Sequence, residues 1–185
     1  MAGVYQTYMV DPLGALTDGL GAAVQTELVK LFKTIVAAEK SFESNVVVFT
    51  PTAAAPAGHE MLVYFMPSKT SVVKHVPKTP ALDLTNDGNT VYAVGASEVY
   101  VAKKDSALLA RLAFHELMHN RLKIGNNLHQ QGGMGAETIG PSTQLNPENI
   151  KTMAAVLCKP IPQWTDGIAI LNNGKNDMFS EYYKV

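Results

Sequence analysis

The stretch SALLARLAFHELMHNRLKI, which covers residues 106–124, is the most informative part of this sequence for predicting the fold. Its apolar residues recur at the spacing of a helix that buries one face. Asp105 or Ser106 can cap the start of this helix, and Gly125 is a natural residue to end it. We therefore expect one helix over residues 106–124.

This predicted helix carries an HExxH motif, His115-Glu116-Leu117-Met118-His119. Because His115 and His119 are four residues apart, both imidazoles lie on one helix face and can approach one metal ion from the same side. Glu116 is rotated by about 100° from His115, so its carboxylate lies beside the ion, where it can take a proton from a bound water. The motif predicts metal-assisted hydrolysis with Zn²⁺ as the metal.

The two histidines share their helix face with three leucines. The face consists of Leu108, Leu112, His115, His119 and Leu122. If the leucines face the core, the imidazoles do too, and burying them beside a carboxylate is costly without partners. A zinc ion would supply those partners. The alternative is a pair of core histidines that hydrogen-bond to backbone carbonyls.

A catalytic zinc site needs a third protein ligand and an open position for water. Downstream, His129 and Glu137 are the candidates. His129 follows Gly125, which lets the chain leave the helix and fold back under the metal. Glu137 lies among glycines and Pro141, which disfavour the helix that would present it. We expect His129 to be the third ligand and keep Glu137 as the alternative.

Residues 115–129, HELMHNRLKIGNNLH, resemble the zincin metallopeptidases and their metzincin branch in particular. The metzincin pattern is HExxHxxGxxH, so the resemblance implies that His115, His119 and His129 bind zinc and that Glu116 is the general base. The spacing departs from the pattern, because Gly125 lies six residues after His119 and His129 lies four residues after Gly125.

The resemblance also implies three features around the zinc. A methionine in a tight turn would lie beneath the metal, and Met134 or Met153 could supply it. A tyrosine hydroxyl would stabilise the oxyanion, for which Tyr182 and Tyr183 are candidates. An antiparallel edge strand before the active helix would pair with the substrate backbone, and residues 91–101 stand in that place. Ordinary packing is the alternative for each of these side chains.

The rest of the chain predicts a small α+β domain. We expect helices over residues 20–42 and 147–158, the latter capped by Asn146, and strands over residues 46–50, 61–66, 71–76 and 91–101. The glycine-rich residues 126–144 are expected to be irregular. These elements predict one zincin-like domain over residues 1–185, with a mixed sheet packed on the early long helix and the HExxH helix.

Composition narrows the functional classes. The chain has 185 residues, 46% of them hydrophobic, which is enough for one core. Its net charge of -1, with scattered basic residues, predicts no nucleic-acid partner and no anionic membrane surface. The one cysteine, Cys158, excludes an internal disulfide and is expected to be a buried thiol. No secretory signal or membrane span is evident, so we expect a cytoplasmic protein or one secreted by a Sec-independent route.

These observations together predict a zinc metallopeptidase that hydrolyses proteins or peptides. One alternative is a zinc hydrolase acting as an exported effector or toxin, kept inactive by an inhibitor or immunity-type partner. Another is a non-catalytic domain in which zinc only holds a small fold together. Glu116 argues against that last alternative, because a structural site has no use for a general base.

Overall fold

The computed structural model describes residues 3–11, 13–38, 42–50, 61–68, 87–91, 96–122 and 126–157. Its strands are β1 (Gly3–Val10), β2 (Phe42–Thr50), β3 (Met61–Met66), β4 (Gly88–Val91) and β5 (Ala96–Tyr100). Its α-helices are α1 (Leu20–Ala38), α2 (Ser106–Leu122) and α3 (Pro147–Leu157), and two short 3-10 helices, η2 (Asn126–Gln131) and η3 (Gly133–Gly135), lie between α2 and α3.

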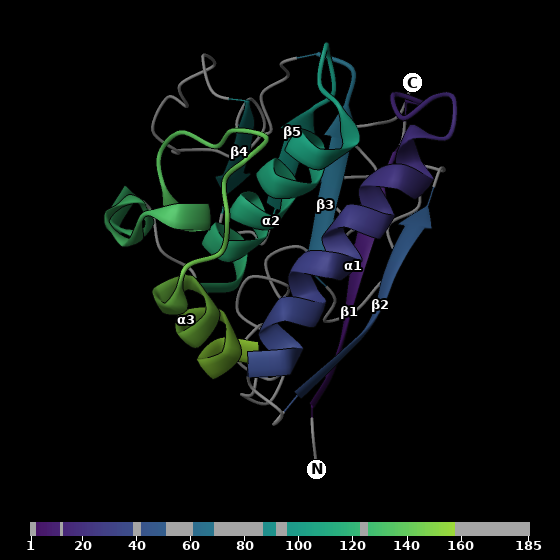
Figure 1. Ribbon diagram of the computed structural model, residues 1–185. Helices are drawn as coiled ribbons and strands as arrows, with labels where there is room; N and C mark the ends of the chain where they lie inside the picture. Colours follow the sequence, from purple (N-terminus) through teal and green to yellow (C-terminus); the bar gives the residue numbers. More distant parts are fainter. Residues whose placement is uncertain are drawn as a thin grey trace, which may run out of the picture.

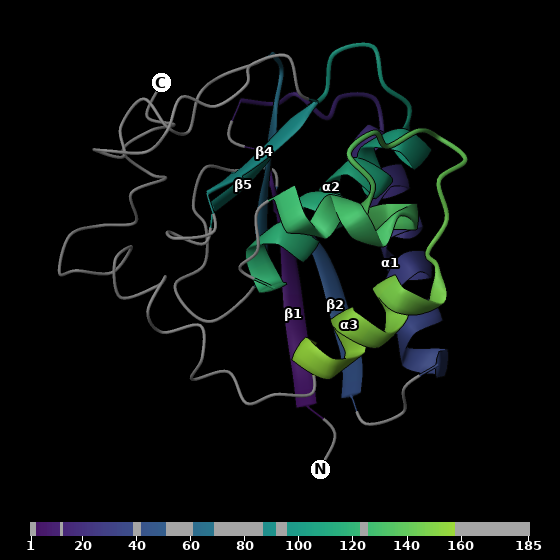
Figure 2. The ribbon, with the colours of Figure 1, turned by 90° about the vertical axis from the view of Figure 1, so that its left-hand side faces the viewer.

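The five strands form one mixed sheet in the order β2-β1-β3-β5-β4. The first four of these run parallel, and β4 pairs antiparallel with β5 at one edge. Helices α1, α2 and α3 lie on the same side of the sheet (Figure 1 and Figure 2). The α+β prediction is confirmed, as is the packing of a mixed sheet against α1 and α2.

The core lies between the sheet and the two longest helices. Helix α1 buries Val24, Leu28 and Phe32 at helical spacing. The ring of Phe32 meets that of Phe114 on α2 edge to face, with the ring centroids 5.3 Å apart. From the sheet side, Phe65 is fully buried in the same cluster. The Phe32–Phe114 contact and the burial of Phe65 together pack α2 against α1 and the sheet.

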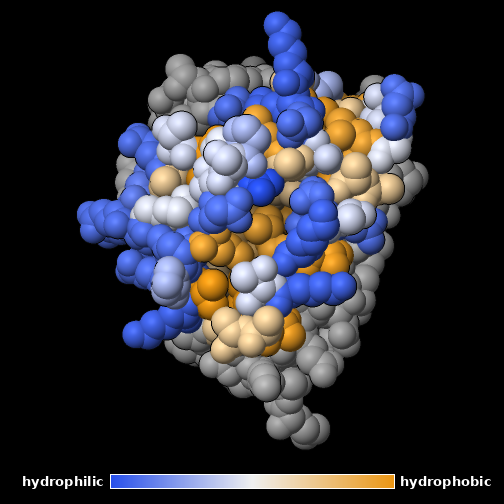
Figure 3. Space-filling view, in the orientation of Figure 1, coloured by the Kyte–Doolittle hydropathy of each residue, from blue (hydrophilic) through white to orange (hydrophobic). Residues whose placement is uncertain are grey.

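The view from the helix side shows hydrophobic residues in the middle of the face, surrounded by hydrophilic ones (Figure 3). Among the large hydrophobic side chains that the structure describes, only Leu13 is exposed. None of the described helices combines the length and the apolarity needed to cross a membrane.

Strand β1 lies inside the sheet between β2 and β3, although the sequence analysis predicted no strand before the first helix. Its residues, GVYQTYMV, are rich in the β-branched and aromatic types that favour strands, which was the available signal. The buried carboxylate of Asp11 follows and accepts hydrogen bonds from the backbone N–H groups of Ala15 (2.7 Å) and Leu16 (2.9 Å). Asp11 thereby shapes the turn that leads from β1 into α1.

Two predicted boundaries are wrong. The first helix ends at Ala38 instead of residue 42, and Phe42 already begins β2, paired with Gly3 of β1. The strand expected over residues 91–101 is not continuous, because Val91 ends β4 and the chain reverses before Ala96–Tyr100 form the antiparallel strand β5. A continuous run of β-forming residues carries no marker of such a reversal beyond its glycine. The strand over residues 61–66 is confirmed as β3, and β2 includes the strand expected over residues 46–50.

The helices on either side of the glycine-rich segment begin as predicted. Asp105 caps α2, since its Oδ1 accepts a hydrogen bond of 2.8 Å from the N–H of Leu108. Asn146 caps α3 in the same way, with 2.8 Å between its Oδ1 and the N of Asn149. Between them, residues 126–131 and 133–135 form 3-10 helices, so the expectation of irregular structure is wrong there. Such short turns need no apolar periodicity and leave no pattern to detect.

Several predictions fall on residues outside the described ranges. They concern Gly125 as the helix end, the strand over residues 71–76, and the burial of Cys158. The single domain over residues 1–185 stays a prediction.

Candidate metal centre

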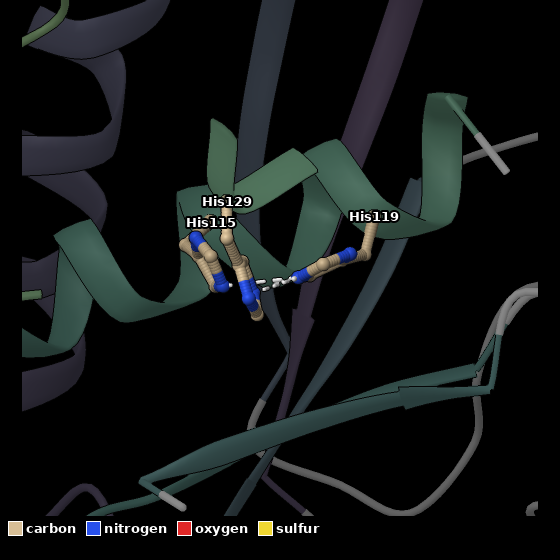
Figure 4. A group of neighbouring side chains, drawn as sticks. All are labelled: His115, His119 and His129. Atoms are coloured by element: carbon tan, nitrogen blue, oxygen red, sulfur yellow. Dashed lines mark hydrogen bonds between the residues drawn. The ribbon is translucent and has the colours of Figure 1, made fainter. Parts of the chain in front are cut away.

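Three histidines from two neighbouring elements meet beside the middle of α2. His115 and His119 lie one turn apart on α2, and His129 comes from η2. Figure 4 shows the three rings pointing toward one another. Among the described residues these three form the group that could hold a metal ion, with their ligand atoms all within 4.8 Å of one another.

The distances between the histidine nitrogens fit a tetrahedral ion. The Nε2 atoms of His115 and His119 are 3.0 Å apart, and those of His119 and His129 are 3.3 Å apart. Two nitrogens bound to one tetrahedral zinc, each at about 2.0–2.1 Å, lie about 3.3–3.4 Å from each other. The three imidazoles are therefore close to the separation at which they would share one cation.

The tautomer of His115 is fixed by the backbone. Its Nδ1 lies 2.8 Å from the carbonyl oxygen of Met134, and because a carbonyl only accepts, Nδ1 carries the proton. In the neutral ring the lone pair then belongs to Nε2, which faces the other histidines. Burial lowers the pKa of His115 to about 3, helped by the neighbouring His119 and His129 and opposed by the hydrogen bond to Met134. His115 is thus held neutral, in the form that binds a metal.

Met134, one of the two candidates for a methionine beneath the metal, lies in η3 with its side chain fully buried. Its contact with the histidines is made by its main chain, through the carbonyl that orients His115. Met153, the other candidate, is buried on α3 in the hydrophobic core. Both methionines are core residues, and Met134 also belongs to the turn beside the site.

Glu116 lies under the edge hairpin of β4 and β5. The hydroxyl of Thr90 on β4 is 2.6 Å from Oε2 of Glu116 and 3.0 Å from its main-chain oxygen. Ser97 on β5, the cross-strand partner of Thr90, donates to the same main-chain oxygen at 3.2 Å. The two strands thus hold both the backbone and the carboxyl group of Glu116.

Glycine at position 88 allows β4 to approach Glu116 closely. A Cβ at Gly88 would lie 2.7 Å from Oε1 and 2.9 Å from Cγ of Glu116. Glu116 is 5% exposed in this arrangement. Burial raises the pKa of its carboxyl to about 8, while the hydrogen bond from Thr90 lowers it and the charge of buried Glu98 raises it further. In the absence of a cation, Glu116 therefore keeps its proton near neutral pH.

The structure brings together the three predicted histidine ligands but not the alternative ligand. Glu137 is exposed and lies outside the histidine cluster. Leu112, His115 and His119, which were predicted to share one face of α2, are all buried. Tyr182 and Tyr183, the candidates for the hydroxyl that stabilises the oxyanion, lie outside the described residues.

Sequence reasoning missed the residues that hold Glu116 and His115 in place. Thr90 and Ser97 left no signal, because their relation to Glu116 depends on the register of β4 with β5, and Thr90 lies before the strand predicted over residues 91–101. Asn149, which contacts the Met134 turn, did leave a weak signal. Asparagine is unfavourable inside a helix, and a buried one needs hydrogen-bond partners.

Comparisons with protein-family models, with curated proteins and with solved structures found no match to this chain.

Proposed function

We propose that this protein is a zinc-dependent hydrolase that cleaves peptide bonds in proteins or peptides, with Glu116 as the general base. The observation that carries the proposal is the convergence of three imidazole nitrogens, from His115, His119 and His129, beside a glutamate on the same helix. We further propose that the chain is a zincin of the metzincin-like kind, which is supported by the HExxH motif and the third histidine downstream.

Zinc is the metal that the donor set favours. Three neutral imidazoles suit Zn²⁺ and other late transition metals better than Mg²⁺ or Ca²⁺, which prefer oxygen ligands. The Nε2 separations of 3.0 and 3.3 Å are close to those of tetrahedral coordination. Three protein ligands also leave one position of a tetrahedron for water or substrate, as in catalytic zinc sites.

When bound, such an ion supplies Lewis acidity, which polarises the scissile carbonyl and makes water more acidic. The carboxylate of Glu116 would accept the proton of the attacking water and return it to the nitrogen of the leaving amine. A cation beside Glu116 favours its ionised form, so the carboxyl that burial keeps protonated could act as a base only with the metal present. Edge strand β4, which lies over Glu116, is the proposed partner of the substrate backbone.

A second candidate is a domain in which the metal has only a structural role. The observation that favours it is the burial of Glu116, whose carboxyl lies against Gly88 and hydrogen-bonds to Thr90. A protonated glutamate in this position could simply link α2 to the edge hairpin. The two candidates differ in whether Glu116 is needed for a reaction or only for stability.

The test is hydrolysis of a denatured test protein by the zinc-loaded chain, with a chelator arm and two matched variants. Glu116→Gln keeps the shape of the side chain but removes the basic carboxylate, so it should retain zinc and lose about 10²-fold or more of the activity. Glu137→Gln makes the same change at an exposed position outside the cluster and should leave activity unchanged. Full activity in the Glu116→Gln variant would rule Glu116 out as the base. Zinc binding without hydrolysis of any test protein would favour the structural role.

A further inference from the structure

Asn149 is a fully buried polar residue near the start of α3, and its side-chain amide forms hydrogen bonds to Asn146 and to residues 131–134. Its Oδ1 accepts hydrogen bonds from the N–H groups of Met134 (2.8 Å) and Asn146 (3.3 Å). Its Nδ2 donates to Oε1 of Gln131 (3.3 Å) and to the carbonyl of Gly132 (3.2 Å). All four hydrogen bonds that an amide side chain can readily form are therefore made.

The turn around Asn149 accepts only glycine at two points. Gly133 has a φ of +54°, and a Cβ there would lie 2.6 Å from Oδ1 of Asn149. A Cβ at Gly135 would lie 3.3 Å from Nδ2 of Asn149 and 2.9 Å from the carbonyl oxygen of Leu128. The backbone over residues 132–135 is thus wrapped closely around one amide group. Any side chain at these glycines would push the turn away from Asn149.

Both segments that Asn149 holds lead directly to the histidine cluster. Met134, whose N–H binds Asn149, uses its carbonyl to accept the Nδ1 proton of His115. Gln131, whose side chain binds Asn149, ends η2, and His129 lies two residues earlier in the same short helix. One amide is therefore connected by two short paths to two of the three proposed ligands.

We propose that Asn149 is a positioning residue of the metal centre, which holds His115 through Met134 and His129 through the end of η2. The inference rests on the proposed metal centre, but not on the proposed hydrolysis. A carbonyl that orients a histidine ligand also fixes its tautomer, and losing support of this kind typically weakens metal binding. Aspartate at position 149 could accept the two hydrogen bonds but could not donate to Gln131 or Gly132.

The first measurement is zinc affinity, by competition with a calibrated chelator. Asn149→Ala should weaken zinc binding about 10–100-fold, and Asn149→Asp should weaken it less, because it keeps the acceptor for Met134. Ala154→Gly is the matched control, since it weakens the same helix at a buried position that makes no side-chain hydrogen bond. It should leave zinc affinity unchanged. Equal affinities of the alanine, aspartate and control variants would overturn the inference.

The second measurement needs no metal and separates this inference from the proposed function. In the metal-free protein, the Nδ1 proton of His115 should give a slowly exchanging imidazole signal in nuclear magnetic resonance spectra. We expect Asn149→Ala to lose this signal and Ala154→Gly to keep it. If the signal survives in Asn149→Ala, the inference is wrong, even if the wild type binds zinc. If the wild type binds zinc but hydrolyses no test protein, the proposed hydrolysis fails, while the zinc affinities and the imidazole signal still decide the role of Asn149.

Discussion

The hydroxyl of Thr90 lies within hydrogen-bond distance of both the main-chain oxygen and the carboxyl Oε2 of Glu116, at 3.0 and 2.6 Å. Thr90 belongs to edge strand β4 and Glu116 to the middle of α2, 26 residues further along the chain. The contact therefore joins the strand proposed to bind substrate to the residue proposed to act as base. Changes at this contact should affect catalysis more than metal binding.

Replacing Thr90 by valine tests this contact directly. Valine keeps the branched shape but loses the hydroxyl, and a hydrogen bond to a charged group contributes about 1.5–3 kcal/mol. We expect Thr90→Val to lower kcat for peptide hydrolysis about tenfold or more, with zinc affinity unchanged. Thr90→Ser should restore most of the activity. A valine variant as active as the wild type would show that Thr90 does not orient Glu116.

A side chain at position 88 should disturb the packing of β4 on Glu116. Because the Cβ of Gly88→Ala would lie 2.7 Å from Oε1 of Glu116, the strand or the carboxyl group must move. Overpacking of this kind costs about 1–3 kcal/mol of unfolding free energy, which urea denaturation can measure. Gly140→Ala is the control, since its Cβ would meet only Oγ1 of Thr143 at 3.9 Å. Equal losses in both variants would contradict the close approach at Gly88.

The identity of the third ligand can be tested by two single substitutions. We expect His129→Ala to weaken zinc affinity by about 10–100-fold or more, because it removes one of three converging nitrogens. Glu137→Ala should leave the affinity nearly unchanged, since Glu137 is exposed and outside the cluster. Competition of each variant against a calibrated chelator measures the difference. The opposite ranking would make Glu137 the ligand.

The stability of the metal-free protein should depend on pH through Glu116. Burial raises the pKa of this carboxyl from 4.5 to about 8. Between these two pH values, the folded chain therefore holds a proton that the unfolded chain has released. The stability that the bound proton contributes is complete below pH 4.5 and is lost as the pH rises through about 8.

His115 contributes to the stability of the metal-free protein over a different pH range. Its folded pKa of about 3 lies below the usual 6.5, so its contribution is present above pH 6.5 and is lost as the pH falls toward 3.

Urea denaturation in the presence of a chelator can isolate the effect of Glu116. Between about pH 7.5 and about pH 8.5, His115 is mostly neutral in both states, and the unfolding free energy of the wild type should fall as the pH rises. Glu116→Gln has no titrating carboxyl at this position, so its curve should be flatter over the same range. Parallel curves for the two proteins would mean that Glu116 is already ionised in the folded, metal-free chain.

The sequence was enough to predict that the three histidines come together, because their spacing is fixed within short segments. Helix geometry alone puts His115 and His119 on one face, four residues apart. His129 could be chosen over Glu137 from local chemistry, since the glycines around Glu137 disfavour a helix. The signal that predicted Asn146 as the cap of α3 was equally local. Each of these predictions needed only a few consecutive residues.

The surroundings of the site could not be predicted from the sequence, because they depend on contacts between distant segments. Thr90 and Ser97 meet Glu116 only after β4 and β5 have paired in the observed register. Asn149 supports His115 only through the turn at Met134. No spacing rule relates residues on different strands and helices, so these relations appear first in the three-dimensional structure.

The three histidines are separated by four and ten residues along the chain, whereas Thr90 and Glu116 are separated by 26. Closing a short loop costs less entropy than closing a long one, and contacts between distant segments tend to form late in folding. A partly folded chain, with the β4–β5 hairpin still detached, would retain most of the geometry for capturing an ion but not the surroundings of Glu116. Metal content alone would therefore overestimate the fraction of correctly folded protein in a preparation.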